Sequence, residues 1–256
     1  MKIVTTVKQV ASRDAALQID PGGRWVDESG LAFEVNEPDA YSLEAALLLK
    51  DQLGGEVVVL CAGPERVGKA IREALAKGAD RAIHIDTPHP EQLDTFSMAR
   101  LLAKAIETES PDLVLTGLQS DDWGAGQTGV AIGEILGWPH ASLIVSIEKT
   151  SGGLRVRREL EGGWFQYIDL PLPAVLTIQS GIARLRYATL MGIKRARTKE
   201  VKVLPAGSLG GTAGSGVAVE RLYEPGRTKS SQIFSGPPAD TAARLVEKLR
   251  FEARVL

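Results

Sequence analysis

The sequence predicts an α/β fold built on a doubly wound, mostly parallel β-sheet. Through the first half of the chain, short runs of β-branched and apolar residues alternate with helical patterns of roughly 10 to 15 residues. This alternation favours parallel strands, because parallel neighbours must be joined by long crossovers that are usually helical. The chain has 256 residues, of which 44% are apolar and 24% are charged, so it can bury a core of ordinary globular size.

The first half of the chain begins with a strand and then alternates helix and strand. The expected strands are KIVTTV (2–7), EVVVLC (56–61), RAIHI (81–85) and PDLVLT (111–116). The expected helices cover residues 36–55, 65–77, 94–108 and 125–136. The first of these helices has Asn36 as its capping residue, Pro38 in its first turn and Gly54-Gly55 at its end, which are typical start and stop signals.

The pattern changes in the second half of the chain. Residues 154–160 and 164–170 flank the turn EGG, which predicts an antiparallel hairpin added to the sheet, and 173–179 reads as another buried strand. A stretch rich in positive charge follows over 180–202.

The end of the chain reads as an extended arm. The segment 206–217 is rich in glycine and resembles a linker, and a last helix is expected over 239–250. This tail has too few apolar residues to form a core of its own. We therefore expect an α/β nucleotide-binding domain over 1–204 and a C-terminal arm over 205–256.

Composition excludes several kinds of site. The formal net charge of −2 gives no global bias toward nucleic acid or acidic membranes. Cys61 is the only cysteine, which excludes an internal disulfide, and the three histidines lack metal-ligand spacing. No apolar stretch approaches the roughly 20 residues that cross a bilayer, and Lys8 interrupts the opening before it could form a signal-peptide core. We expect a cytoplasmic, soluble chain with no metal site and no direct membrane insertion.

The segment GPERVGKA (63–70) matches the phosphate-binding P-loop pattern only superficially. Ala70 stands where a serine or threonine hydroxyl should meet Mg²⁺. The apolar stripe of Val67, Ile71 and Leu75 also places Gly68-Lys69 inside a helix. We interpret the match as accidental. The preceding Ala62 still lies at the carboxyl end of a strand, where open α/β sheets bind ligands.

The loop GLQSDDWGAGQTG (117–129) is the strongest candidate binding site. Its four glycines would let the backbone approach a ligand closely. Gln127 and Thr128 lie near the start of the next helix, whose free amide groups and dipole favour an anion. The alternative is a plain turn in which these two residues serve as caps. The adjacent acids Asp121 and Asp122 disfavour a polyphosphate, so a monophosphate fits better.

The two aspartates do not make this loop a catalytic centre. Adjacent carboxylates can act as an acid/base pair or hold a metal, but no nucleophile accompanies Asp121 and Asp122. Aspartates near a helix start more commonly serve as caps. We find no catalytic constellation in the sequence and expect that the chain is not an enzyme.

The basic stretch over 184–202 has three interpretations. Nucleic-acid binding is disfavoured, because Tyr187 is the one aromatic residue available for base stacking. A solvated charged face is a second possibility. In the third, the apolar segment YATLMGI (187–193), flanked by cations, docks on an acidic protein partner.

Several of these stretches, taken in order, resemble the β subunit of electron transfer flavoprotein. The matching stretches are MKIVTTVKQV, NEPDAYSLEAALLLKD, LCAGP, DDWGAGQTG, VRRELEGGWFQYIDLPLPAVLTIQ and RYATLMGIKRARTKEV. The resemblance runs from Met1 to about Leu204 and is most specific over 156–179 and in RYATL. It implies an adenine nucleotide alpha hydrolase-like fold, related to the universal stress and PP-loop proteins.

The resemblance also implies a function. The chain would form an obligate heterodimer with a larger α subunit, on which the arm 205–256 would wrap. FAD held mainly by α would carry electrons from acyl-CoA and other dehydrogenases to a quinone oxidoreductase. This chain would bind AMP, and the contacts carried over by the resemblance are Thr6, Asn36, Glu37, Pro38, Asp39, Ala62, Gly117, Leu118, Gln119, Ser120, Asp121, Asp122, Trp123, Gly124, Ala125, Gly126, Gln127 and Thr128.

Leu190 in RYATL matches the leucine that anchors the partner dehydrogenase. With it, the expected docking residues are Tyr187, Arg186, Lys194, Arg195 and Arg197. The sequence departs from the family pattern in places. Arg13 and Pro38 stand where some members have aromatic residues that face the flavin, and Trp123 stands where the pattern is often acidic or small.

Two alternatives keep the fold and change the role. In electron-bifurcating relatives the β subunit holds a second FAD, but those loops tend to end in a QVGP-like sequence, whereas this loop ends in Gln127-Thr128-Gly129. A stand-alone nucleotide hydrolase would need a phosphate-cleaving apparatus, which the defective GPERVGKA segment does not supply.

Overall fold

The computed structural model describes residues 1–210, 215–226 and 231–256. These fall into two compact units, Met1–Leu222 and Tyr223–Leu256. The first unit contains the β-sheet, and the second contains α6 (Pro238–Phe251). Residues 211–214 of the expected linker and 227–230 of the expected arm lie outside the described residues.

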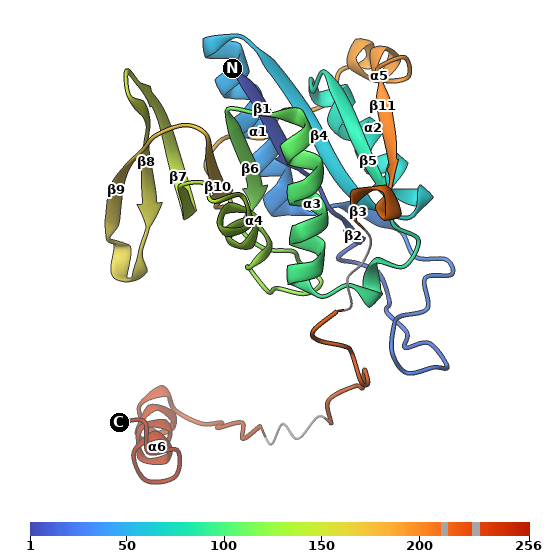
Figure 1. Ribbon diagram of the computed structural model, residues 1–256. Helices are drawn as coiled ribbons and strands as arrows, with labels where there is room; N and C mark the ends of the chain where they lie inside the picture. The colour runs from blue at the N-terminus through green and yellow to red at the C-terminus, as the bar shows by residue number, and fades with distance from the viewer. Residues whose placement is uncertain (211–214, 227–230) are drawn as a thin grey trace. The chain divides into compact units, whose positions relative to one another are not determined.

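Within the described residues, nine strands form one sheet in the order β11-β5-β4-β1-β6-β10-β7-β8-β9 (Figure 1). Strands β11 to β7 in this order are parallel, while β8 pairs antiparallel with both β7 and β9. The strand bounds are β1 (Lys2–Thr6), β4 (Glu56–Gly63), β5 (Arg81–Asp86), β6 (Leu113–Gly117), β7 (His140–Thr150), β8 (Gly153–Glu159), β9 (Phe165–Leu170), β10 (Ala174–Ile178) and β11 (Val201–Pro205). A separate antiparallel pair joins β2 (Gln9–Ala11) to β3 (Phe33–Val35). The predicted fold class is confirmed.

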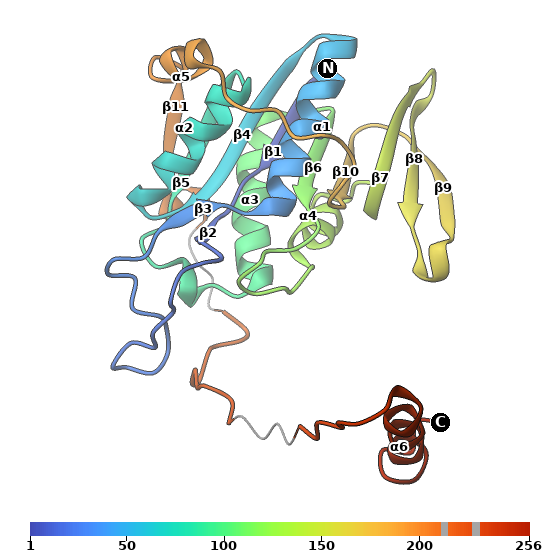
Figure 2. The same ribbon diagram turned by 180° about the vertical axis from the view of Figure 1, so that it is seen from behind.

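Helices cover both faces of the sheet. They are α1 (Glu37–Leu53), α2 (Gly68–Lys77), α3 (Thr95–Glu109), α4 (Thr128–Leu136) and α5 (Leu190–Ala196). Side chains of α1 and α2 pack in one core cluster, and those of α3 and α4 pack in the other (Figures 1 and 2). Because both faces are covered, the central strands are buried along nearly their whole length, as parallel strands usually are.

The two faces separate at β1 and β6, which are neighbours in the sheet. The chain leaves β1 toward α1 on one face and leaves β6 toward α4 on the other. The loops after these two strands therefore diverge and leave a crevice at the carboxyl edge of the sheet, which is the usual ligand position in doubly wound folds.

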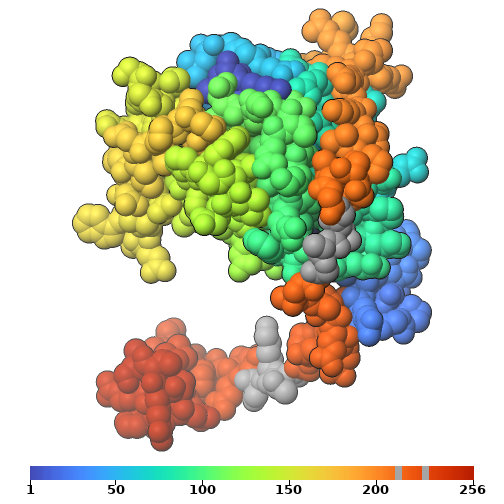
Figure 3. Space-filling model, in the orientation of Figure 1, coloured from blue at the N-terminus to red at the C-terminus, as the bar shows by residue number. Residues whose placement is uncertain are grey.

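The expected hairpin is formed by β8 and β9. Gly162 and Gly163 in its turn have positive φ angles of 67° and 78°, the conformation for which glycine is suited. The hairpin (yellow) lies at the opposite side of the sheet from β11 (orange) in the space-filling view (Figure 3).

Five of the strands and α-helices in the described residues are absent from the sequence-based prediction, namely β2, β3, β7, α5 and β11. In β7 the buried side chains are Ala141 and Ile144, three residues apart, because Leu143 has a φ of 60° and the pairing register shifts beside it. This irregularity breaks the period-two pattern that identifies a strand. α5 has only seven residues, which is too short for a helical pattern.

The predicted start of α4 is wrong by three residues. The helix begins at Thr128 rather than Ala125. Gly126, with a φ of 64°, is not in a helical conformation, so it ends the loop before the helix starts. None of the helices in the described parts of the chain combines the length and hydropathy that a membrane crossing requires.

Candidate functional site

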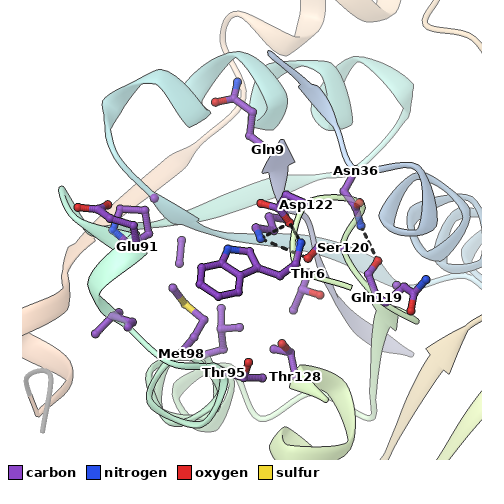
Figure 4. Close-up of a pocket in the computed structure, with 18 of the residues that line it drawn as sticks. Thr6, Gln9, Asn36, Glu91, Thr95, Met98, Gln119, Ser120, Asp122 and Thr128 are labelled. Carbon is purple, nitrogen blue, oxygen red and sulfur yellow. Dashed lines mark hydrogen bonds and ion pairs between the residues drawn. The ribbon is translucent and has the colours of Figure 1, made fainter. Parts of the chain in front are cut away.

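A cavity of about 470 Å³ opens at the carboxyl edge of the sheet. Thr6, Ala62 and Gly117 line it from the ends of β1, β4 and β6, three adjacent parallel strands. Thr95 and Thr128, from the first turns of α3 and α4, lie at one end of the cavity in Figure 4, and Gln9 lies at the other. The volume is that of a small-molecule site.

Asp39 is a buried residue that lines this cavity. Its side chain is buried, and Oδ2 accepts hydrogen bonds from the Lys8 backbone amide at 2.9 Å and the Asn36 amide at 3.1 Å. Oδ1 accepts one from the Gly117 amide at 3.0 Å. Burial raises the pKa of Asp39 to about 6, and these hydrogen bonds oppose the rise. A Cβ on Gly117 would lie 2.5 Å from Asp39 Oδ1, so the end of β6 requires glycine.

Asn36 connects α1 to the glycine-rich loop. It occupies the N-cap position of α1 as predicted, but its side chain makes no cap hydrogen bond. The side-chain amide instead donates to Gln119 O at 2.9 Å (Figure 4). The side-chain oxygen accepts from the Asp121 amide at 2.9 Å. Asn36 therefore fixes the backbone of the loop from a position about eighty residues earlier in the chain.

The two loop aspartates are paired with cations from the start of the chain. Lys8 Nζ lies 2.6 Å from Asp122 Oδ1, and Arg13 pairs with both Asp121 and Glu37. The cap interpretation of Asp121 and Asp122 is wrong, since α4 begins only at Thr128. Each carboxylate has its own cation, so the adjacent acids are arranged as structural ion pairs rather than as an acid/base couple.

The loop backbone turns sharply before α4. Gly124 and Gly126 both have positive φ angles, 62° and 64°, and the Gly124 amide donates to Ser120 O at 2.8 Å. Gln127 occupies the N-cap position of α4, but its side chain makes no cap hydrogen bond. The first-turn amides of α4 follow directly, and such amides lack partners within their own helix.

Most of the residues assigned to the nucleotide do line the cavity. Those that line it are Thr6, Asn36, Asp39, Ala62, Gly117, Leu118, Gln119, Ser120, Asp122, Trp123, Gly126, Gln127 and Thr128. The remaining assigned residues, Glu37, Pro38, Asp121, Gly124 and Ala125, are not among the residues that line it.

A match to a known family accompanies this geometry. The family model for the electron transfer flavoprotein domain matches residues 24–209. The chain belongs to the electron transfer flavoprotein family. Relatives along nearly the whole chain are named as its β subunit: that of Methylophilus methylotrophus is 38% identical over 96% of this chain and 97% of its own length. The human subunit is 33% identical over 100% of this chain and 99% of its own length. The mitochondrial subunit of Oryza sativa is 32% identical over the full length of both. These names describe electron carriers rather than enzymes.

Several cavity residues of this family member were not predicted. Lys8 and Gln9 follow the first strand, and Trp25 comes from the loop before β3. Arg66 lines the cavity as well, where it bonds to Gln9 Oε1 at 2.7 Å and to both oxygens of Glu28 at 2.8 and 3.1 Å. Its guanidinium also lies 4.0 Å from the centre of the Phe33 ring. The position of Arg66 just after Ala62-Gly63-Pro64 is the sequence signal that could have identified it.

The P-loop match is accidental, as predicted. A 3-10 turn over Glu65–Val67 runs directly into α2, and Ala70 is buried against the sheet. The described ranges 1–210, 215–226 and 231–256 hold no group of three histidine, cysteine or carboxylate side chains that could bind a metal ion.

The expected docking residues lie on and before α5. Leu190 is 87% exposed and Tyr187 is 91% exposed, so neither packs in the core. Lys194, Arg195 and Arg197 are exposed as well. Arg186 is only partly exposed, and its side chain pairs with Glu44 and Asp51 of α1.

α5 is held closely against α2. A Cβ on Gly192 would overlap the Ala76 carbonyl oxygen, so the two helices approach at this glycine. Arg72 of α2 donates to the Ala196 and Lys199 carbonyls at 2.6 and 2.9 Å. Leu190 is thus displayed by a short helix whose position is fixed by its neighbour.

Proposed function

We propose that this chain is the β subunit of a heterodimeric electron transfer flavoprotein. A larger α subunit would hold most of the FAD, which supplies the redox chemistry of the assembly. Electrons would pass from acyl-CoA and other dehydrogenases to a quinone oxidoreductase. The family membership supports the electron-transfer role, and the heterodimer, these partners and a cytoplasmic location are parts of the proposal.

The observation that carries the proposal for this chain is the cavity at the sheet edge, to which we assign AMP. Its volume of about 470 Å³ suits a mononucleotide. The first-turn amides of α4, beside Gly126, suit a phosphate group, because a helix start carries partial positive charge. Glycines at 117 and 126 leave the backbone open to close approach.

A monophosphate suits this cavity better than a longer phosphate chain. Lys8 and Arg66, which line it, are already paired with Asp122 and Glu28. Asp39, Glu91 and Asp94 add carboxyl groups to the lining. Additional phosphates would therefore meet negative charge, since both cations among the described residues that line the cavity are already paired. A second FAD would in addition need room for a ribityl chain and a three-ring flavin beyond its AMP portion.

The nucleotide content of the purified protein tests this assignment. Denaturation should release about one equivalent of AMP per chain, since a tightly held ligand stays with the folded state. Chromatography of the released compound identifies it, and the absorbance spectrum reports any flavin. A yellow chromophore from this chain alone would favour the bifurcating type, and the absence of any nucleotide would refute a nucleotide-binding β subunit.

Leu190 is proposed to anchor the dehydrogenase. An exposed leucine among the cations Lys194, Arg195 and Arg197 has the usual composition of an interface hot spot, with an apolar centre and a charged rim. Arg186 is bound to α1 and would hold the segment in place rather than contact the partner.

A further inference from the structure

Two loop segments that are remote in sequence line one side of the cavity. One lies between β2 and β3 and contributes Trp25. The other follows β11 and contributes Val217, Ala218 and Val219. We call residues 20–28 and 215–222 together the lid. Neither segment belongs to the strand ends and helix starts at the sheet edge.

The first lid segment is joined to the glycine-rich loop by an aromatic contact. The rings of Trp25 and Trp123 are stacked with centroids 5.8 Å apart and an interplanar angle of 29°. Both rings line the cavity, and Trp123 is 49% exposed. Trp25 Nε1 also donates to Glu28 Oε1 at 3.2 Å, and Glu28 pairs with Arg66. The stack therefore connects two loops that are about a hundred residues apart in sequence.

Hydrogen bonds hold the second lid segment at both of its ends. Near its start, Asp94 Oδ2 accepts hydrogen bonds from the Gly216 and Val217 amides at 2.7 and 3.2 Å. At its end, the Leu222 amide donates to Gly23 O of the first lid segment at 2.7 Å. The two segments are thus tied to each other as well as to the body of the molecule.

We propose that the lid must open before the nucleotide can enter or leave the cavity. This inference rests on the proposed AMP site and adds a mechanism of retention to it. The contacts that hold the lid include the Trp25–Trp123 stack, the Glu28–Arg66 ion pair and a few hydrogen bonds between loops. Val217 is 72% exposed, so this part of the lid buries little apolar area. Such segments open without unfolding of the domain, and lids of this kind commonly set rates of ligand release.

The release rate of AMP tests the lid. The full chain, assembled with its α subunit, is loaded with radiolabelled AMP and then mixed with excess unlabelled AMP, and the retained label is followed over time. Trp25→Ala removes the stack and should speed release by about threefold to tenfold, the range that an aromatic pair supports. Trp25→Phe keeps an aromatic ring and should release near the wild-type rate. Trp164→Ala, on the exposed turn of the hairpin, is the matched control and should leave the rate unchanged.

A second variant tests the other fastening independently. Asp94 Oδ1 accepts the Ser97 amide at 2.7 Å and caps α3, whereas Oδ2 holds the lid. Asp94→Asn can retain the cap through its oxygen, because asparagine is also a good N-cap residue. It places an amide donor against the Gly216 and Val217 amides, so release should again be faster, with an unchanged melting temperature of the nucleotide-free protein.

The outcomes separate the lid from the site itself. Wild-type release rates in both Trp25→Ala and Asp94→Asn would overturn the lid while leaving the AMP site intact. Faster release from Trp123→Ala but not from Trp25→Ala would also overturn it, because Trp123 would then contact the nucleotide directly. A wild-type protein that retains no label at the start of the chase would refute the AMP site, and the lid with it.

Discussion

Gly124 and Gly126 have nearly the same positive φ angle, yet only Gly126 lines the cavity. Valine at either position should cost about 1–2 kcal/mol of folding stability, because a β-branched residue is strained at positive φ. Gly126→Val should also block approach of the backbone to the nucleotide and lose bound AMP, whereas Gly124→Val should retain it. Both expectations are tested by measuring the AMP released per chain on denaturation together with the melting temperature. Equal AMP content in the two variants would contradict the placement of the nucleotide at Gly126.

Asp39 makes the stability of the protein depend on pH in an unusual direction. Its pKa is raised from 3.8 to about 6 by burial, so the folded state keeps the proton while the unfolded state ionises. Its contribution to stability is complete below about pH 3.8 and falls by up to about 3 kcal/mol as pH rises through 6. The side chain in Asp39→Asn cannot titrate, so this variant should not show that loss of stability with rising pH.

Urea unfolding of the nucleotide-free proteins between about pH 4 and pH 7 measures the effect of Asp39. The free energy of unfolding of the wild type minus that of Asp39→Asn should decrease across this interval. Other carboxyl groups, such as Glu109 beside Arg81, titrate in both proteins and cancel in the difference. A difference that stays constant with pH would show that Asp39 is ionised throughout.

At the level of elements, α5 displays Leu190 without using it for packing. Leu190→Ala should leave the melting temperature unchanged, because the side chain is 87% exposed. Truncation of an interface anchor commonly costs more than about 1 kcal/mol, so electron transfer from an acyl-CoA dehydrogenase should slow roughly tenfold. Dehydrogenase-coupled dye reduction measures this rate. Val203→Ala, an exposed apolar truncation on β11, serves as the control, and an equal effect of the two variants would argue against a specific anchor.

The elements that the sequence predicts correctly are those with long, regular patterns. α1 begins after Asn36 and ends before Gly54, as its start and stop signals indicate. The buried strands β1, β4 and β6 are equally clear, because both faces are apolar. α5 escapes prediction because its position depends on the contact of Gly192 with α2, which no local pattern records.

At the scale of the whole molecule, the cavity is assembled from segments far apart in the chain. The glycine-rich loop and the ends of the first strands were identifiable, since parallel strands bring their carboxyl ends to one edge. The cations that neutralise the loop could not be identified from the sequence. Lys8 and Asp122 are separated by more than a hundred residues and meet only in the folded protein. Asn36 and the amide of Asp121 are 85 residues apart and likewise meet only in the folded protein. Pairs so far apart in the chain have no characteristic spacing, so no sequence motif reveals them.

The second unit of the molecule has exposed apolar residues that its own packing does not cover. In the described part of this unit, α6 has no buried residue, and Leu245, Val246 and Phe251 are 47%, 45% and 70% exposed. An amphipathic helix without a core of its own needs a partner surface. The proposed wrapping of the arm 205–256 on the α subunit would supply that surface.

Changing the apolar side of α6 should therefore weaken the heterodimer without harming the first unit. Leu245→Glu combined with Phe251→Glu should lower the affinity for α about tenfold or more, because burying a charge in an apolar interface is costly. AMP content and the melting temperature of the isolated chain should not change, since the cavity lies in Met1–Leu222. Glu247→Ala, an exposed polar change on the same helix, should bind α normally. Affinity measured by titration with purified α decides the matter, and normal binding by the double variant would mean that the heterodimer is held by the first unit alone.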